Sequence, residues 1–249
     1  MGNPLRPLTE EIADGVWRHA GDLRQGMNVY LVREEDGSGV FAFDAGTSSM
    51  AKEISEAAER LGGLTRVVLG HSHVDHRGSA PKLGVPVLCH QNEVADAQGD
   101  GGVSYQRLGD IPVRYSRWLY RAVFPIWDGG PIEIARTVAA GARIGGFEVM
   151  HFPGHAPGLI GLWRESDRLC LCSDTIYLTD STRPLGHHPG IYPPHPAFDL
   201  DSEQTIASVR KLAALEPAVV APGHMGPLRG EPAELRRLLD EAADNRTGW

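Results

Sequence analysis

The chain contains a short run rich in side chains that bind metal ions: His71-Ser72-His73-Val74-Asp75-His76. Four candidate ligands lie in this run, although only 11 of the 249 residues are histidine. Imidazole and carboxylate groups are the usual ligands of zinc and other first-row metals. A polar loop that happens to hold three histidines is the simpler alternative, and the rest of the sequence decides between the two.

A predicted strand leads into this run. Residues Thr65-Arg66-Val67-Val68-Leu69 are mostly β-branched or apolar, which is typical of a buried strand. If the chain stays extended beyond it, His71 and His73 share a face, because side chains alternate along a strand. If a turn or helix then begins, Asp75 and His76 face a second point nearby. One loop can therefore serve two metal positions.

Three further candidate ligands each follow a predicted strand. His155 lies in Pro153-Gly154-His155, Asp174 in Ser173-Asp174-Thr175 and His224 in Pro222-Gly223-His224. Loops at the ends of strands are where a sheet places its functional groups. Taken alone, His155 could be a polar strand-end residue and Asp174 a helix cap. Their recurrence at strand ends favours metal binding.

In this order the candidate ligands resemble those of the metallo-β-lactamase superfamily: His71, His73, Asp75, His76, His155, Asp174 and His224. The resemblance spans most of the chain, starting at Asp44. It implies an α/β (α+β) fold, a four-layered αββα sandwich. It also implies that His71, His73 and His155 hold one metal ion. Asp75, His76 and His224 would hold a second ion, and Asp174 would bridge the two.

The resemblance implies a dinuclear metal-dependent hydrolase of a carboxylic ester, lactone or thioester. Its cofactors would be two divalent ions, with zinc expected and iron or manganese as alternatives. A hydroxide bridging the two ions would attack the substrate, because bound metal lowers the pKa of water towards ~7.

Asp75 and Tyr177 are the candidate catalytic residues. Lactonases of this superfamily carry a tyrosine three residues after the bridging aspartate, where Tyr177 stands, and its hydroxyl would bind the substrate's carbonyl oxygen. A half-buried structural tyrosine is the alternative. Asp44 would orient a ligand histidine from behind, as metal sites require, or would only form a turn.

Other activities of the same fold remain as alternatives. A persulfide dioxygenase would use one iron held by two histidines and one aspartate of this set. A β-lactam hydrolase typically lacks the bridging aspartate that Asp174 provides. A phosphodiesterase is disfavoured by the net charge of −8, because polyanion binding depends on Lys and Arg.

Only 25 residues follow His224, too few for the glutathione-binding extension of glyoxalase II. A non-catalytic binding protein is the last alternative.

Composition suits one domain over residues 1–249, because 41% of the residues are apolar. Cys89, Cys170 and Cys172 form no C-x-x-C pair and are expected to be buried free thiols. No signal peptide or membrane span is apparent, so a cytoplasmic location is expected. We expect a small-molecule substrate and no nucleic-acid or membrane partner, and a homodimer is a candidate assembly.

The apolar pattern alternates strands and helices. Strands are predicted over residues 15–20, 27–33, 40–43, 65–69, 85–88, 137–143, 147–152, 159–164, 168–173 and 219–220. Helices are predicted from a cap at Ser48 or Ser49 to Leu61, over 76–83, 91–98 and 202–215, and from Pro232 onward.

Two segments depart from this alternation. Residues 103–130 hold six of the 17 aromatic residues and form an insertion: a lid over the substrate, an oligomer contact or core packing. Residues 180–198 are expected to be a loop, with His187, His188 and His195 as exposed side chains rather than residues of the cleft.

Overall fold

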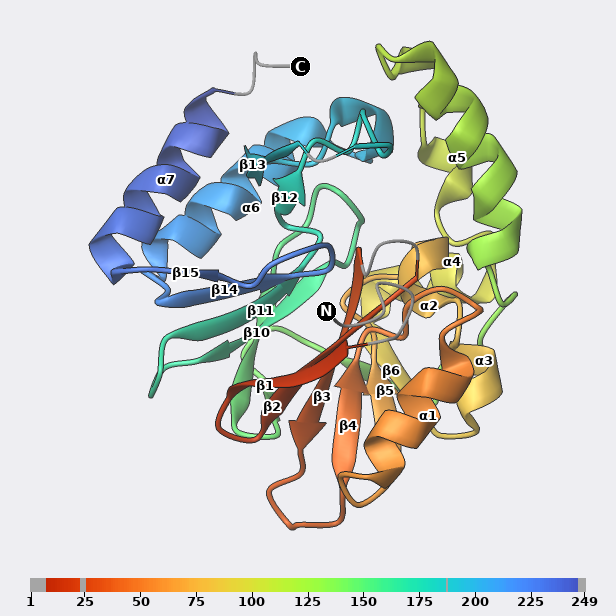
Figure 1. Ribbon diagram of the computed structural model, residues 1–249, viewed down its shortest axis with the longest axis vertical. Helices are drawn as coiled ribbons and strands as arrows, with labels where there is room; N and C mark the ends of the chain where they lie inside the picture. Colours follow the sequence, from red (N-terminus) through yellow and green to blue (C-terminus); the bar gives the residue numbers. More distant parts are fainter. Residues whose placement is uncertain (1–7, 23–25, 187, 246–249) are drawn as a thin grey trace.

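Residues 8–22, 26–186 and 188–245 are described by the computed structural model of the chain. Two β-sheets pack face to face, and helices cover the outer face of each sheet (Figure 1). This is the αββα sandwich that the sequence predicts. Residues 1–7, at the end where the sequence shows no signal peptide, lie outside the described residues.

The first sheet has seven strands in the described part of the chain, in spatial order β1 to β7. They are β1 (Leu8–Ala13), β2 (Val16–Gly21), β3 (Met27–Arg33), β4 (Val40–Phe43), β5 (Leu64–Val68), β6 (Val87–His90) and β7 (Arg136–Val138). Strands β1 to β4 form an antiparallel meander, whereas β4 to β7 run parallel. Six of the seven residues of β3 are buried, as expected for a strand covered on both faces.

The second sheet follows the order β15-β14-β11-β10-β9-β8. Its strands are β8 (Arg143–Ile144), β9 (Phe147–His151), β10 (Ile160–Arg164), β11 (Leu169–Ser173), β14 (Val219–Pro222) and β15 (Leu228–Arg229). In this second sheet, among the described residues, only β11 and β14 pair in parallel. A separate small ladder joins β12 (Tyr177–Thr179) to β13 (Pro189–Tyr192).

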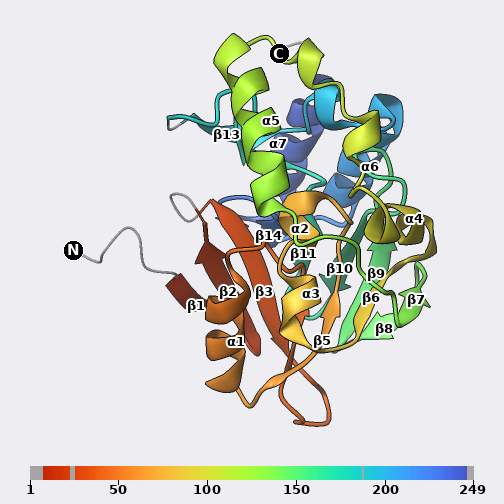
Figure 2. The same ribbon diagram turned by 90° about the vertical axis from the view of Figure 1, so that its right-hand side faces the viewer.

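Helices cover both outer faces and one end of the sandwich (Figure 2). They are α1 (Ala51–Glu59), α2 (Val74–Arg77), α3 (Ala80–Leu83), α4 (Val94–Gln98), α5 (Arg114–Trp127), α6 (Ser202–Ala214) and α7 (Pro232–Asp244). Short 3₁₀ helices cover Gln91–Glu93, Val103–Tyr105, Leu108–Asp110 and Pro196–Phe198. In the part of the chain that the structure describes, no helix is both long and apolar enough to cross a membrane.

Three apolar layers hold these elements together. Phe41 and Phe43 of the first sheet meet Phe147 of the second between the sheets. Helix α1 buries Ile54 against the first sheet, and α6 and α7 pack on the second with side chains such as Leu212. Burying one side chain of this size stabilises the fold by about 1.5–3 kcal/mol. All three cysteines are free and buried, as predicted.

The structure corrects several local predictions. Neither Ser48 nor Ser49 caps α1: its N-cap is Met50, which makes no side-chain hydrogen bond. The helix predicted over 76–83 is two helices, α2 and α3, because Pro81 lacks the N–H that would continue the first one.

Two further corrections concern strands. The strand predicted over 137–143 is divided, because β7 pairs with β6 and β8 with β9, so the chain crosses between the sheets there. The loop predicted over 180–198 contains β13. Strands β1, β12 and β15 were not predicted at all.

The aromatic segment 103–130 contains α5, which lies beside one end of the sandwich (Figure 1). Its inner face packs Phe124 into a cluster with Val74 of α2 and Phe198. Its outer face leaves Trp118 and Ile126 exposed by 72% and 71%. Core packing therefore accounts for part of the segment, and the lid and oligomer contact stay predictions.

Candidate metal centre

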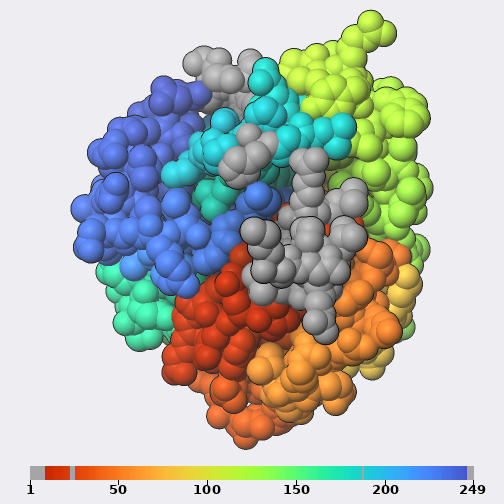
Figure 3. Space-filling view, in the orientation of Figure 1, coloured from red at the N-terminus to blue at the C-terminus, as the bar shows by residue number. Residues whose placement is uncertain are grey.

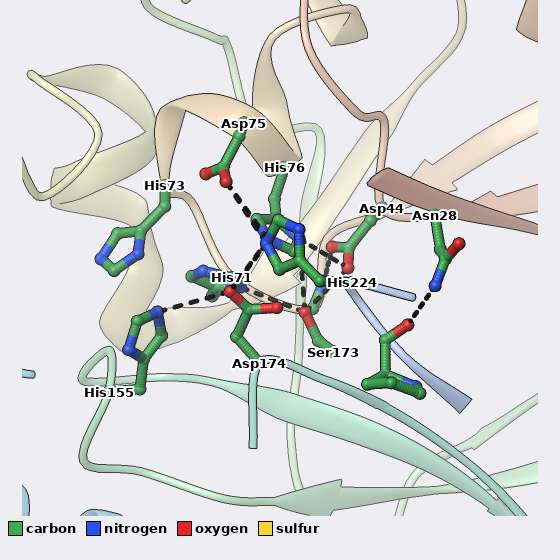
Figure 4. A network of polar contacts seen from close by, with 12 residues as sticks. Asn28, Asp44, His71, His73, Asp75, His76, His155, Ser173, Asp174 and His224 are labelled. Carbon is green, nitrogen blue, oxygen red and sulfur yellow. Dashed lines mark hydrogen bonds and ion pairs between the residues drawn. The ribbon is translucent and has the colours of Figure 1, made fainter. Parts of the chain in front are cut away.

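The seven predicted ligands meet at one edge of the sandwich (Figure 4). His71 and His73 lie in the loop after β5, and Asp75 and His76 belong to the first turn of α2. The other three come from the second sheet: His155 between β9 and β10, Asp174 after β11 and His224 after β14. Parallel strands β4 and β5 in one sheet and β11 and β14 in the other bring their carboxyl ends to this edge.

The side chains form two groups with the spacing of metal sites. Candidate ligand atoms of His71, His73 and His155 all lie within 4.8 Å of one another. The same limit holds for Asp75, His76 and His224. These are the two triads that the family resemblance implies. Candidate ligand atoms of Asp44, His71 and His76 also lie within this distance of one another. The hydrogen bonds of Asp44, however, fit a residue that orients His76 and not a metal ligand.

Asp174 lies between the two triads. Its Oδ2 is 3.2 Å from His76 Nε2 and 3.3 Å from His224 Nε2. The same oxygen is 3.7 Å from His155 Nε2, which belongs to the other triad. One carboxylate thus faces ligands from both groups, which is the position that a bridging ligand needs.

Three histidines are oriented through Nδ1. This atom lies 3.1 Å from Ser173 Oγ in His71, 3.0 Å from Asp44 Oδ2 in His76 and 3.4 Å from Asp199 Oδ1 in His155. Their Nε2 atoms, like Asp174 Oδ1, are buried without a hydrogen-bond partner among the described residues. Leaving such an atom unsatisfied costs about 1–3 kcal/mol. Metal coordination would satisfy these atoms, so the donor set fits a metal ion.

Asp44 connects three strand ends. Its Oδ1 accepts a hydrogen bond from the backbone N–H of Gly70 at 2.7 Å, and its Oδ2 accepts one from Ser173 Oγ at 2.8 Å. Asp44, Ser173 and Met225 all adopt positive φ angles, of 63°, 44° and 63°. This conformation is uncommon for residues other than glycine and costs of order 1 kcal/mol or more each. Three of the six non-glycine residues with positive φ among the described residues therefore lie beside candidate ligands.

The charges of the two triads differ. Burial and the neighbouring imidazoles lower the pKa of His71 and His73 well below the usual value, so both are neutral. Burial also disfavours the charged form of His224, but Asp174 outweighs it and raises the pKa of His224 to about 10. Burial raises the pKa of Asp75, but His76 and His224 overcome this effect and bring it to about 2. A metal ion in the second triad must therefore displace protons from histidine.

Tyr177 lies beside both triads. Its ring centroid is 5.4 Å from that of His224 and 6.2 Å from that of His155. Burial, followed by the charges of Asp174 and Asp75, raises the pKa of Tyr177 well above its usual value. The hydroxyl is therefore protonated and able to donate a hydrogen bond.

The histidines of the 180–198 segment are placed differently from the prediction. His195 is buried, and its Nδ1 accepts a hydrogen bond from the backbone N–H of Ala197 at 3.0 Å. It caps the 3₁₀ helix at Pro196–Phe198, so the prediction of an exposed side chain is wrong for it. His188 is half-buried, and His187 lies outside the described residues.

Glu93 is one of the site residues that the sequence did not reveal. This buried carboxylate accepts hydrogen bonds from the backbone N–H of Ser72 at 2.7 Å and of Gly158 at 2.6 Å. It therefore joins the loop of His71 and His73 to the loop that follows His155. Burial raises the pKa of Glu93 to about 7. It stands at the start of a predicted helix, where nothing marks it as different from a surface residue.

The loop of His224 is fixed from the first sheet. Asn28 Nδ2 donates to the carbonyl oxygens of Pro222 at 2.9 Å and Met225 at 2.6 Å (Figure 4 shows Asn28 beside the site). Tyr30 Oη also donates to the Pro222 carbonyl at 2.6 Å. Two side chains of β3 therefore position a ligand carried by the other sheet.

Comparisons with known proteins agree with this arrangement. The sequence model of the metallo-beta-lactamase superfamily matches residues 24–224. A protein of Bacillus subtilis (strain 168), "Probable metallo-hydrolase YflN", is 28% identical over 269 residues, with 98% of each chain covered.

Solved structures share the fold. The metallo-beta-lactamase family protein TTHA1429 from Thermus thermophilus gives a TM-score of 0.62 at 18% identity, over 95% of this chain and 81% of that one. TTHA1623, solved in a di-iron-bound form, gives 0.57 at 22% identity, over 90% of this chain and 94% of that one. The family match over residues 24–224 and the shared fold lead to one conclusion: this chain belongs to the metallo-β-lactamase superfamily, and proteins named as probable metallo-hydrolases are among its relatives.

Proposed function

We propose that this chain is a dinuclear metal-dependent hydrolase of a carboxylic ester, lactone or thioester. The observation that carries the proposal is the place of Asp174, whose Oδ2 faces Nε2 atoms of both triads at 3.2–3.7 Å. A site for a single ion would not need a carboxylate shared between two sets of ligands. Two adjacent ions are typical of enzymes that hydrolyse esters and related bonds.

One ion would be held by His71, His73 and His155. The other ion would be held by Asp75, His76 and His224. Asp174 would bind both ions. We propose zinc, with iron or manganese as alternatives, since the ligands are nitrogen and oxygen. When bound, such ions lower the pKa of water and polarise the substrate's oxygen. The di-iron form of TTHA1623 supports a pair of ions on this fold and keeps iron among the candidates.

Asp75 and Tyr177 complete the proposed chemistry. The Asp75 side chain is 18% exposed, and its low pKa keeps it ionised. It would accept a hydrogen bond from the attacking water and orient it. The protonated Tyr177 hydroxyl would donate to the substrate's oxygen as negative charge develops there.

Helix α5 and the segment after Tyr177 would cover the substrate. Ser116 Oγ donates to the carbonyl oxygen of Thr182 at 2.6 Å, and Tyr120 Oη donates to that of Ser181 at 2.6 Å. Figure 3 shows α5 and the segment around β13 side by side at one end of the molecule. We propose that they form a lid over the apolar part of a small-molecule substrate.

We also propose that α5 forms a homodimer contact, because Trp118 on the same helix is exposed. We propose no nucleic-acid or membrane partner for a chain with a net charge of −8. Three free, buried cysteines support the proposal of a cytoplasmic location.

The test is hydrolysis of a panel of lactones, esters and thioesters by the metal-loaded protein. On the best substrate, Tyr177→Phe should lower kcat by about 100- to 1,000-fold. The control, Tyr115→Phe, removes a hydroxyl from the exposed face of α5 and should change nothing. Loaded protein that hydrolyses none of the panel, and instead consumes oxygen with a persulfide, would contradict the proposal and favour the dioxygenase.

A further inference from the structure

His73 is oriented through a different nitrogen from its neighbours. In His71, His76 and His155 the oriented atom is Nδ1. In His73 it is Nε2, which lies 2.7 Å from the hydroxyl oxygen of Tyr105. The nitrogen left to reach a metal ion is therefore Nδ1 in His73 and Nε2 in the other three histidines.

If His73 binds a metal ion, the direction of the hydrogen bonds at the Tyr105 hydroxyl is fixed. A histidine that binds through Nδ1 carries its proton on Nε2, so Tyr105 Oη must accept that proton's hydrogen bond. The hydroxyl's own proton then needs an acceptor. Asp96 of α4 can provide one, because its carboxylate interacts with Tyr105 and its Oδ2 is buried without a hydrogen-bond partner among the described residues.

The backbone around Tyr105 is shaped to hold this contact. Asp100 accepts hydrogen bonds from the backbone N–H groups of Gly102 at 3.0 Å and Ser104 at 2.9 Å, which fixes the turn. Gly102 has a φ of +71°, and a Cβ there would lie 2.5 Å from Tyr105 Oη and 2.9 Å from His73 Cδ2. Glycine is therefore required where the turn passes the tyrosine and the histidine.

We propose that Tyr105 is a positioning residue for the metal ion held by His71, His73 and His155. Tyr105 ends the 3₁₀ helix Val103–Tyr105, at the start of the aromatic segment 103–130. The inserted segment thus contributes to the metal site as well as covering it. This inference rests on the proposed function only in requiring that His73 bind a metal ion.

The experiment compares Tyr105→Phe with wild type. Phenylalanine keeps the ring and removes only the hydroxyl, so His73 Nε2 loses its acceptor. Loss of such a partner typically lowers metal affinity by about 10- to 100-fold. We expect a loss of this size for the first ion, measured by zinc competition with a chromophoric chelator. The second ion's affinity and the melting temperature of the metal-free protein should stay at wild-type values.

Two additional variants make the result specific. In a His224→Ala background the second triad is incomplete, so the remaining ion reports on His71, His73 and His155 alone, and Tyr105→Phe should still weaken its binding about 10- to 100-fold. Tyr115→Phe is the control, because Tyr115 is exposed on α5 and should leave both affinities unchanged.

Three outcomes would overturn the inference. Equal affinities of Tyr105→Phe and wild type would refute the role of the hydroxyl while leaving the proposed function intact. Equal weakening of both ions together with a lower melting temperature of the metal-free protein would show a general structural role instead. A His224→Ala protein that keeps Tyr105 and still binds no ion would refute both this inference and the proposed first metal position.

Discussion

The hydroxyl of Ser173 donates to Oδ2 of Asp44 at 2.8 Å, across 129 residues of sequence. His71 Nδ1 lies 3.1 Å from the same hydroxyl, and His76 Nδ1 lies 3.0 Å from the same carboxylate oxygen. With metal bound, a consistent set of protons would follow: both histidines would donate from Nδ1, which leaves the lone pair of each Nε2 for a metal ion. One serine–aspartate pair therefore orients a histidine from each triad.

Ser173→Ala should weaken the binding of both metal ions by about tenfold, because His71 loses its acceptor and Asp44 loses a donor. Ser173→Gly removes the same hydroxyl and also relieves the backbone at φ 44°. We expect equal losses of affinity for the two variants, with the glycine variant at least as stable as the alanine variant. Zinc competition and thermal unfolding measure these quantities, and wild-type affinity in both variants would refute the role of the hydroxyl.

Gly223→Ala should disrupt the second triad without unfolding the protein. A Cβ at this position would collide with Asp174 Oδ1 and with His76 Cε1, so the bridging carboxylate must move. We expect metal binding to weaken by at least about tenfold, judged from the sensitivity of such sites to ligand orientation. Gly109→Ala is the matched control, since a Cβ there meets nothing within 4 Å. A wild-type metal content in Gly223→Ala would contradict the geometry described.

Arg77 anchors both ends of the segment that contains α5. Its guanidinium donates to Asp128 from Nε at 3.1 Å and from Nη2 at 3.0 Å, and to the carbonyl oxygens of Asp96, Ala97 and Gly99. Arg77→Lys cannot reproduce this planar set of contacts and should lower the free energy of unfolding by about 3 kcal/mol.

Urea unfolding measures that loss, and limited proteolysis should cut residues 99–128 faster in Arg77→Lys than in wild type. The control is Arg143→Lys. Arg143 forms an exposed ion pair of 3.7 Å with Glu148, which should contribute less than about 1 kcal/mol. Equal stability of the two variants would show that the buried contacts of Arg77 do not hold the segment.

His19 should make the fold sensitive to acid. Burial, with a smaller contribution from Arg60, lowers its pKa from 6.5 to about 4. The unfolded chain takes up this proton near pH 6.5 and the native protein only near pH 4, so stability is full above pH 6.5 and declines as the pH falls towards 4. A difference of about 2.5 pH units corresponds to about 3 kcal/mol.

His19→Gln should lose this part of the acid sensitivity. Urea unfolding of the metal-free proteins at pH 7 and pH 4.5 gives the comparison, because chelation separates the effect from the metal site. The free-energy difference between wild type and variant should shrink at the lower pH. A difference that is the same at both pH values would refute the assignment.

The sequence alone identified the main strands and the seven candidate ligands. Both depend on local patterns: apolar runs such as Val67–Val68 and motifs at strand ends such as Pro222-Gly223-His224. Because functional loops follow strand ends, these motifs could be assigned to one edge of a sandwich before any contact was known. Their binding of metal stays a prediction.

The supporting residues could not be found in this way, because their roles depend on distant partners. Ser173 stands beside a predicted ligand, yet only the folded chain shows its contact with Asp44. Tyr105 looked like one aromatic residue among several, and Glu93 like a surface residue of a helix. The division of 137–143 between two sheets was missed for the same reason, since strand pairing decides it.

The central claim is tested most directly by the number of metal ions that one chain binds. Mass spectrometry of metals on protein purified without added metal, and again after zinc saturation, gives that number. We predict close to two ions per wild-type chain and close to one in His224→Ala. A wild-type chain that holds one iron and little else, or no ion even after saturation, would contradict the dinuclear site.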